Sequence, residues 1–154
     1  MRKRLRKIRF NISIAQLALI SLLVYATFPI SHKIVLIKSA SISPYDRYDY
    51  LLFRPLITKV DNEFITVPAL FKTDLASIPR ALWSFMAPNT AHFVYPSILH
   101  DYLYTYPATH SRIWCDEVFY SYLLERGVSP LKAYQIYIAV RIFGGSHFAN
   151  KGNG

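Results

Sequence analysis

Hydrophobic and polar positions divide the chain into three successive patterns: an uncharged apolar run, strand-like segments and helix-like segments. The apolar run, residues 12–30, contains no charged residue, and its small polar or amide side chains are Ser13, Gln16, Ser21 and Thr27. At 1.5 Å per residue, a helix of this length reaches about 28 Å, close to the roughly 30 Å hydrocarbon core of a bilayer. The pattern therefore predicts a transmembrane helix.

Basic residues ahead of this run give it an orientation. Six of the 18 lysine and arginine residues lie within residues 1–10, and without these six the net charge falls from +9 to +3. Because basic flanks stay on the cytoplasmic side, we expect a single-pass membrane protein with a cytoplasmic N-terminus. Residues 1–31 would be the basic leader and anchor, and residues 32–154 an extracytoplasmic domain.

Two other interpretations of the N-terminal segment stay open. One is a cleaved signal peptide, for which Val24-Tyr25-Ala26 offers a site, and the other is a buried or interfacial helix. The charge left outside the leader is too small to follow a phosphate backbone, so the expected partner is a membrane and not nucleic acid. The single cysteine, Cys115, excludes a disulfide within the chain.

Strand-like segments follow the anchor. Residues 33–38, 48–60 and 63–71 are rich in β-branched and aromatic side chains, and Asp61-Asn62 predicts a hairpin turn between the last two. Pro55 and Pro68 restrict these strands to sheet edges or bulges. Residues 39–47 are polar and predict a loop.

From residue 77 onward the pattern is helical. Capping and stop signals predict four helices: Ser77 to Pro88, about Pro96 to Thr105, Ser111 to Gly127, and Ser129 to Gly144. The last helix is apolar nearly all round and should be buried centrally or lie against a membrane. On the third helix, Glu117 and Ser121 should lie opposite the buried stripe. Strands followed by helices indicate an α+β fold, with a small antiparallel sheet and a bundle of three to four helices.

The second and third helices carry the candidate chemistry. A turn centred near Ala108 would make them antiparallel, so that His100 is level with Asp116 and Tyr104 with Arg112. An imidazole facing a carboxylate is the arrangement of a general base. Tyr104 shares a face with His100 and can reach the same carboxylate. His100, Asp116 and Tyr104 are thus candidate catalytic residues, although a structural hydrogen bond between two helices explains the pair as well.

Other polar residues are candidates for a metal or a substrate. Asp101 is rotated by about 100° from His100 around the helix, so a separate role in metal binding suits it. Asp74 ends a strand, where it can face a cleft or cap a turn. The cofactor we consider is a divalent cation such as Ca²⁺, which prefers oxygen ligands. Arg80 and Arg112 can bind a substrate phosphate or carboxylate, or serve as salt-bridge partners.

The hairpin resembles secreted phospholipase A2. That family's His-Asp-x-x-Tyr motif is matched by His100, Asp101 and Tyr104, and its Cys-Asp on the facing helix by Cys115-Asp116. The resemblance implies that the histidine activates a water for attack on a lipid ester. The adjacent aspartate would bind calcium, while the distant aspartate and the tyrosine orient the histidine. The chain departs from that family in lacking its Gly-rich calcium loop and its disulfides.

Residues 64–145 as a whole are similar to a small family of unknown function from bacteria and their phages. The similarity comprises the run Thr73-Asp74-Leu75-Ala76-Ser77-Ile78-Pro79-Arg80, the run His100-Asp101-Tyr102-Leu103-Tyr104, the positions Ser111, Arg112, Asp116 and Phe119, and the run Val140-Arg141-Ile142-Phe143-Gly144-Gly145. The chain departs at Leu70, where that family usually has glycine.

Two functional hypotheses follow. The first is a membrane-anchored hydrolase acting on an ester or similar bond at the membrane or envelope. The second is a non-catalytic envelope or phage-accessory protein in which the His/Asp cluster is structural. A metal phosphohydrolase using His92, His100, Asp101 and Asp116 fits their order, but the spacings are far shorter than that all-helical fold uses.

Overall fold

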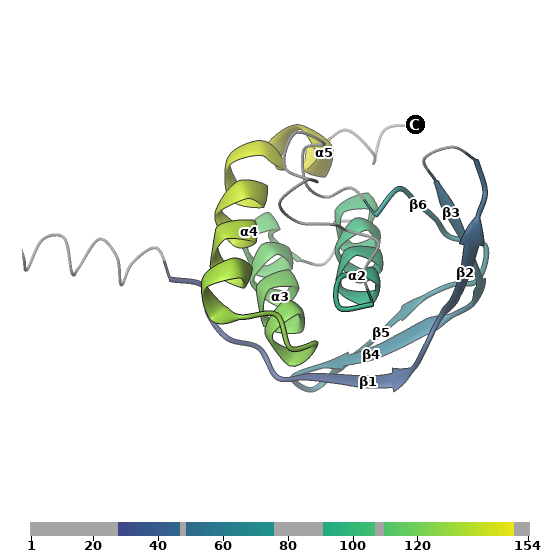
Figure 1. Cartoon of the computed structure of the whole chain (residues 1–154), viewed down its shortest axis with the longest axis horizontal. Coiled ribbons are helices and arrows are strands. Elements are labelled where there is room, and N and C mark those ends of the chain that lie inside the picture. Colours follow the sequence, from purple (N-terminus) through teal and green to yellow (C-terminus); the bar gives the residue numbers. More distant parts are fainter. Residues whose placement is uncertain (1–27, 47–48, 76–90, 107–109, 150–154) are drawn as a thin grey trace, which may run out of the picture.

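The computed structural model describes residues 28–46, 49–75, 91–106 and 110–149, in which two small antiparallel sheets precede four helices (Figure 1). The predicted α+β class is therefore confirmed. Residues 12–27 of the predicted anchor, the predicted helix from Ser77 and the candidate Arg80 lie outside the described residues. Within the described ranges, no helix has the length and apolar character needed to cross a membrane.

The first sheet contains β1 (Ile34–Lys38), β4 (Leu56–Val60) and β5 (Glu63–Val67) in the order β1-β4-β5. The hairpin predicted at Asp61-Asn62 joins β4 to β5, and Asp61 has a left-handed φ of 51°. Asparagine and aspartate tolerate this conformation better than most residues, which is why the pair signals a turn.

The second sheet contains β2 (Ser41–Pro44), β3 (Tyr50–Arg54) and β6 (Lys72–Thr73) in the order β2-β3-β6. Two predictions are wrong here. Residues 48–60 are not one strand, because the chain leaves the second sheet at Pro55 and enters the first. The predicted loop at residues 39–47 contains β2, which pairs with β3 despite its polar composition. Its proline is tolerated because β2 is an edge strand.

Leu70 has a φ of 67°, in the region that favours glycine. The backbone N–H of Leu70 donates to Leu52 O at 2.7 Å, which holds the turn before β6 against β3. This is a conformation that glycine adopts without strain, in agreement with the glycine that the family resemblance implies at this position.

The helices are α2 (Val94–Thr105), α3 (Arg112–Glu125), α4 (Pro130–Phe143) and α5 (Gly145–Ala149). Ser111 caps α3 as predicted, since its Oγ accepts a hydrogen bond from Trp114 N at 3.2 Å. Gly127, with a φ of 85°, follows the C-terminal end of α3 and helps to terminate that helix. Pro130 occupies the first turn of α4 as predicted, whereas α5 follows Gly144 without having been predicted.

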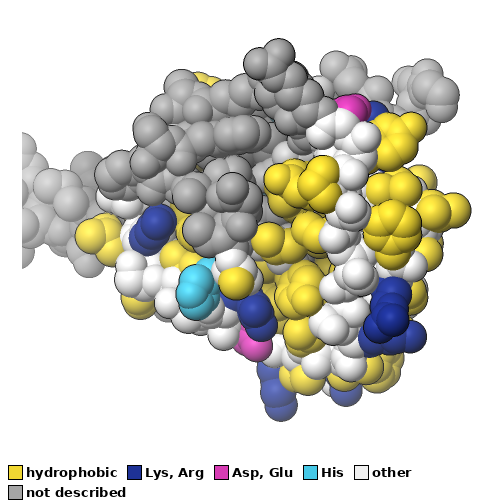
Figure 2. Space-filling view, turned by 45° about the vertical axis from the view of Figure 1, so that its right-hand side comes forward, with side chains coloured by type: hydrophobic (Ala, Val, Ile, Leu, Met, Phe, Trp, Pro, Cys, Tyr) yellow, Lys and Arg dark blue, Asp and Glu magenta, His cyan; other side chains and the backbone are white. Residues whose placement is uncertain are grey.

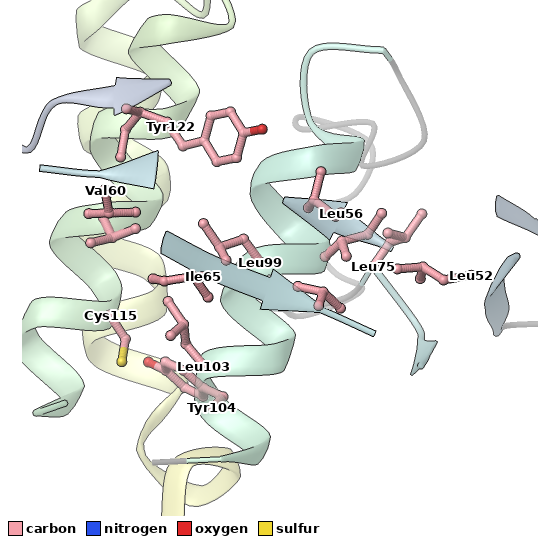
Figure 3. Packing of buried hydrophobic residues seen from close by; sticks show 14 residues of the cluster. Leu52, Leu56, Val60, Ile65, Leu75, Leu99, Leu103, Tyr104, Cys115 and Tyr122 are labelled. Carbon is pink, nitrogen blue, oxygen red and sulfur yellow. The ribbon is translucent and has the colours of Figure 1, made fainter. Parts of the chain in front are cut away.

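The core lies between the inner faces of the two sheets and the helical hairpin α2–α3. Figure 3 shows side chains of the two layers meeting there, and the fully buried ones include Leu52, Leu56, Val60, Leu99 and Tyr122. On the other side of α3, the inner face of α4 buries a second apolar cluster around Phe119 and Ile136. The α2–α3 hairpin is thus enclosed by the sheets on one side and by α4 on the other.

Glu117 and Ser121 are not on a solvent-facing side of α3 as predicted. Both are buried, because the segment that leads into β1 crosses α3 above them. Ile30 N donates to Glu117 Oε1 at 3.1 Å, and His32 N donates to Ser121 Oγ at 2.9 Å. These side chains satisfy backbone groups from a distant part of the sequence, which helical periodicity alone does not reveal.

Candidate functional site

The hairpin brings His100 and Asp116 into contact, as the sequence predicts. His100 Nε2 lies 2.9 Å from Asp116 Oδ1 across the α2–α3 interface. The two residues are 1% and 0% exposed. The imidazole also stacks on Phe119 of α3, with ring centroids 4.6 Å apart. The histidine is therefore fixed by packing as well as by its hydrogen bond.

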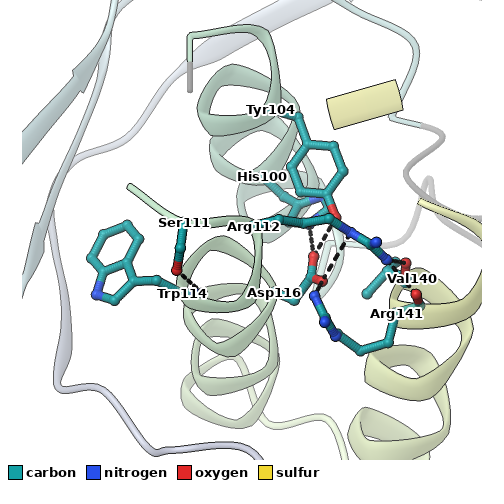
Figure 4. A network of polar contacts seen from close by, with 8 residues as sticks. All are labelled: His100, Tyr104, Ser111, Arg112, Trp114, Asp116, Val140 and Arg141. Atoms are coloured by element: carbon teal, nitrogen blue, oxygen red, sulfur yellow. Dashed lines mark hydrogen bonds and ion pairs between the residues drawn. The ribbon is translucent and has the colours of Figure 1, made fainter. Parts of the chain in front are cut away.

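Tyr104 binds the same carboxylate from one turn further along α2. Its hydroxyl donates to Asp116 Oδ1, and its ring lies 4.1 Å from the His100 ring (Figure 4). Burial raises the pKa of Tyr104, and the neighbouring Asp116 charge raises it further. The phenol thus stays protonated and acts as a hydrogen-bond donor to the carboxylate.

Two arginines complete the surroundings of Asp116. Arg141 Nη1 from α4 donates to Asp116 Oδ2 at 2.8 Å, and Arg112 Nε lies 3.8 Å from the same oxygen. Burial by itself raises the pKa of Asp116, but the hydrogen bonds from His100, Tyr104 and Arg141 outweigh it and leave this pKa below the ordinary value. The carboxylate is therefore ionised although it is buried.

Arg112 lies beside Asp116, as the salt-bridge alternative predicts, and it also binds backbone carbonyls. Its Nη2 donates to Val140 O at 3.0 Å and also to Arg141 O. Both carbonyls belong to the last turn of α4, where cationic side chains are favourable. Arg112 therefore ties the end of α4 to the start of α3, and any binding of a substrate by this side chain stays a prediction.

Sequence reasoning assigned no role to Arg141. The signal was present, since Arg141 is one of only two charged residues in α4 and lies in its last turn. Its pairing with Asp116 depends on how α4 packs against α3, and neither helix alone predicts that contact. The residues around Asp116 thus come from three helices, α2, α3 and α4 (Figure 4).

Asp101 faces a different environment from His100, as the helical rotation predicts. Its Oδ2 accepts a hydrogen bond from Thr73 Oγ1 of β6. Asp101 and Asp74 line one pocket of about 240 Å³ together with Asp49, Lys72 and Thr73. The two residues predicted to bind a metal are therefore neighbours in this pocket, separate from the buried cluster around Asp116.

In the described part of the chain, no group of three or more His, Cys, Asp or Glu residues is arranged to hold a metal ion. His92 contacts Arg126 O at the far end of α3 from Asp116. Ten residues of helix separate these two positions, about 15 Å along the axis. His92 is therefore too far from Asp116 to join it in one metal site, which the metal phosphohydrolase interpretation requires.

The domain is thus an α+β domain with two small antiparallel sheets and a helical hairpin that holds a buried His–Asp pair. The chain belongs to the DUF1353 family of proteins of unknown function, whose sequence profile matches residues 50–140. The match extends from β3 into the last turn of α4 and includes His100, Asp101, Tyr104, Arg112 and Asp116. Neither a comparison with curated proteins nor one with solved structures gave a significant match.

Proposed function

We propose that this chain is a membrane-anchored hydrolase that cleaves an ester or similar bond at the membrane or envelope, with His100 as its general base. One observation carries the proposal. Among the described residues, His100 Nδ1 is buried without a hydrogen-bond partner, although Nε2 of the same ring is held by Asp116. Buried polar atoms normally have partners, so an oriented imidazole with one unused nitrogen calls for an explanation. Base catalysis provides it.

The chemistry follows from the orientation of the ring. An ionised carboxylate only accepts hydrogen bonds, so Nε2 donates to Asp116 and the lone pair of the neutral imidazole is on Nδ1. Nδ1 would take a proton from a water molecule whose oxygen attacks the carbonyl carbon of the ester. Asp116 would stabilise the resulting imidazolium. The proton would then pass to the departing alkoxide as its C–O bond breaks.

Asp116 and Tyr104 are positioning residues in this proposal. Both act through the imidazole, Asp116 directly and Tyr104 by donating to the same carboxylate. The arrangement is the one that the resemblance to secreted phospholipase A2 implies for the matching residues. Asp101, the next residue on α2, borders the polar pocket and is where the same resemblance would place calcium.

A second candidate is a non-catalytic envelope or phage-accessory protein in which the cluster is structural. The observation that favours it is the near-complete burial of His100 and Asp116, at 1% and 0% exposure. Arg141 and Arg112 also contribute positive charge beside Asp116, which suits a cluster that joins three helices.

The two candidates differ in what His100→Ala changes. The test uses the full-length chain in mixed micelles, assayed with a panel of fluorogenic carboxylic esters that includes a phospholipid. The hydrolase proposal expects activity in the parent and a loss of about 10²- to 10⁴-fold in His100→Ala, measured at a temperature at which both proteins are folded. His92→Ala, at an exposed histidine, is the matched control and should retain activity. A parent that is inactive on the whole panel, or a folded His100→Ala variant that keeps the activity of the parent, would favour the structural candidate.

The membrane arrangement has its own test. We place the N-terminus in the cytoplasm and residues 32–154 across the membrane, because basic residues precede the uncharged run. A periplasmic-type enzymatic reporter fused after Gly154 should therefore be active, and a reporter that works only in the cytoplasm should be silent. The reverse pattern would remove the proposed localisation.

A further inference from the structure

The outer face of α4 is largely apolar although the helix lies at the surface, and Gln135 is the exposed polar residue on it. Its inner residues pack on α3, while Leu131 and Ile142 are 70% and 66% exposed at opposite ends. Between them, Tyr134 and Ile138 are partly buried and follow at helical spacing, so the four side chains form one stripe. We call these four residues the α4 stripe. Solvated helix faces normally carry polar side chains, and exposed apolar groups that line up indicate a contact surface.

The chain that follows the predicted anchor lies beside this stripe. Phe28 stacks on Tyr134 with ring centroids 4.9 Å apart and nearly parallel planes. Two residues later, Ile30 is 66% exposed and its N–H donates to Glu117 of α3. Residues 28–30 end the apolar run proposed as the anchor, and in the structure they are not helical but lie against the domain. A bilayer around the proposed anchor would therefore begin within a short stretch of chain from the stripe.

The charges on α4 suit an anionic surface. The helix contains no aspartate or glutamate, and of its two charged residues Arg141 is paired with Asp116, which leaves Lys132 to face an external anion. Lys132 is next to Leu131 in the sequence, and its ammonium lies 5.2 Å from the centre of the Phe93 ring. Apolar and aromatic side chains beside lysine are typical of helices that lie in the headgroup region of anionic membranes.

We propose that the α4 stripe docks onto the anionic phospholipid surface of the membrane in which the chain is anchored. Leu131 and Ile142 enter the boundary between headgroups and acyl chains, and Lys132 pairs with headgroup phosphates. This docking rests on the proposed membrane anchor but not on hydrolysis. It would hold the domain in one orientation, with α4 toward the lipid and the sheets away from it (Figure 1).

Another apolar surface competes for this assignment. Hydrophobic side chains also gather over the face shown in Figure 2, and Phe53, Phe64 and Leu70 are among the exposed hydrophobic residues of the sheet region. Phe64 is 62% exposed on the outer side of β5, and Lys59 lies over its ring. Unlike α4, this surface has no described contact with residues 28–30. A probe placed on it therefore serves as the control for lipid contact at the α4 stripe.

The experiment measures contact with lipid at single tryptophans introduced into the full-length chain. Leu131→Trp and Phe64→Trp are compared after reconstitution in vesicles of equal parts phosphatidylcholine and brominated phosphatidylglycerol, with the parent's own tryptophan signal subtracted. Docking predicts that bromine quenches Leu131→Trp at least roughly twofold more than Phe64→Trp, since the bromine lies at the depth of an interfacial helix. Adding Lys132→Glu should reduce this excess, and raising the salt concentration should reduce it too.

Three results would overturn the proposal. They are equal quenching at the two positions, stronger quenching at Phe64→Trp, or no quenching at Leu131→Trp. A concentration-dependent blue shift of Leu131→Trp in neutral detergent, without lipid, would instead identify a second copy of the chain as the occupant. The His100→Ala variant should leave the quenching unchanged. Loss of hydrolysis with quenching intact therefore bears on the catalytic proposal alone, and loss of quenching with hydrolysis intact bears on docking alone.

Discussion

Replacing Asp116 with alanine should lower the free energy of unfolding by about 3–5 kcal/mol, as expected when one partner of a buried charge cluster is removed. The carboxylate accepts from His100 and Tyr104 through Oδ1 and from Arg141 through Oδ2. Without it, the guanidinium of Arg141, whose side chain is 30% exposed, and the buried donors of His100 and Tyr104 lose their acceptor. Nearby backbone carbonyls already accept from Arg112, so the freed donors have few alternatives.

Thermal and urea unfolding of the full-length protein in detergent, followed by near-ultraviolet circular dichroism, measure this loss. Glu63→Ala is the control, because that carboxylate also pairs with a histidine, His110, but its side chain is 50% exposed. An exposed pair of this kind contributes at most about 1 kcal/mol. If the two substitutions cost the same, the cluster does not hold α2, α3 and α4 together.

The catalytic proposal requires this structural role and adds to it. A base oriented by Asp116 needs a carboxylate that is itself fixed, and Arg141 and Tyr104 fix it. Loss of stability in Asp116→Ala therefore does not separate the two candidate functions. The activity of folded His100→Ala does separate them, because only the catalytic candidate needs the imidazole for a reaction.

Local signals in the sequence predicted the elements that depend on local chemistry. The Ser111 cap, the Asp61-Asn62 turn and the Pro130 start each involve side chains acting on backbone within a few residues, and all three are present. The boundary at Pro55 was missed because a change of sheet depends on which strands pair, and pairing is not local. The strand β2 was missed for the same reason, since β3 supplies its hydrogen bonds.

The candidate site divides in the same way. His100, Tyr104 and Asp116 could be placed together because a short hairpin fixes the register of two helices, and the contacts agree with that register. Arg141 and the burial of Glu117 could not be predicted, since each depends on a segment remote in sequence. Arg112 was recognised as an anion-binding side chain, but the competing carbonyls of α4 emerge only from the packing.

The difference in free energy of unfolding between the parent and Asp116→Asn should become smaller as the pH falls. The pKa of Asp116 in the folded protein is below the ordinary value of 3.8, because hydrogen bonds and charges from its neighbours outweigh the effect of burial. A depressed carboxyl pKa means that the unfolded chain binds the proton more tightly. The contribution of Asp116 is then fully present above pH 4 or so, and it is lost as the pH falls through the folded pKa.

Urea midpoints of the parent and Asp116→Asn, measured from neutral pH down to about pH 3, report this directly. At neutral pH the asparagine variant should be the less stable protein, since an amide cannot replace a charge beside Arg141. Toward acid the parent should lose stability faster than the variant, because only the parent has this group to protonate. Glu63→Gln serves as the exposed control, and its gap to the parent should change little. A gap between the parent and Asp116→Asn that stays constant across this range would mean that Asp116 does not ionise with a depressed pKa in the folded protein. The proposed orientation of His100, in which Nε2 donates to an ionised Asp116, would then be wrong.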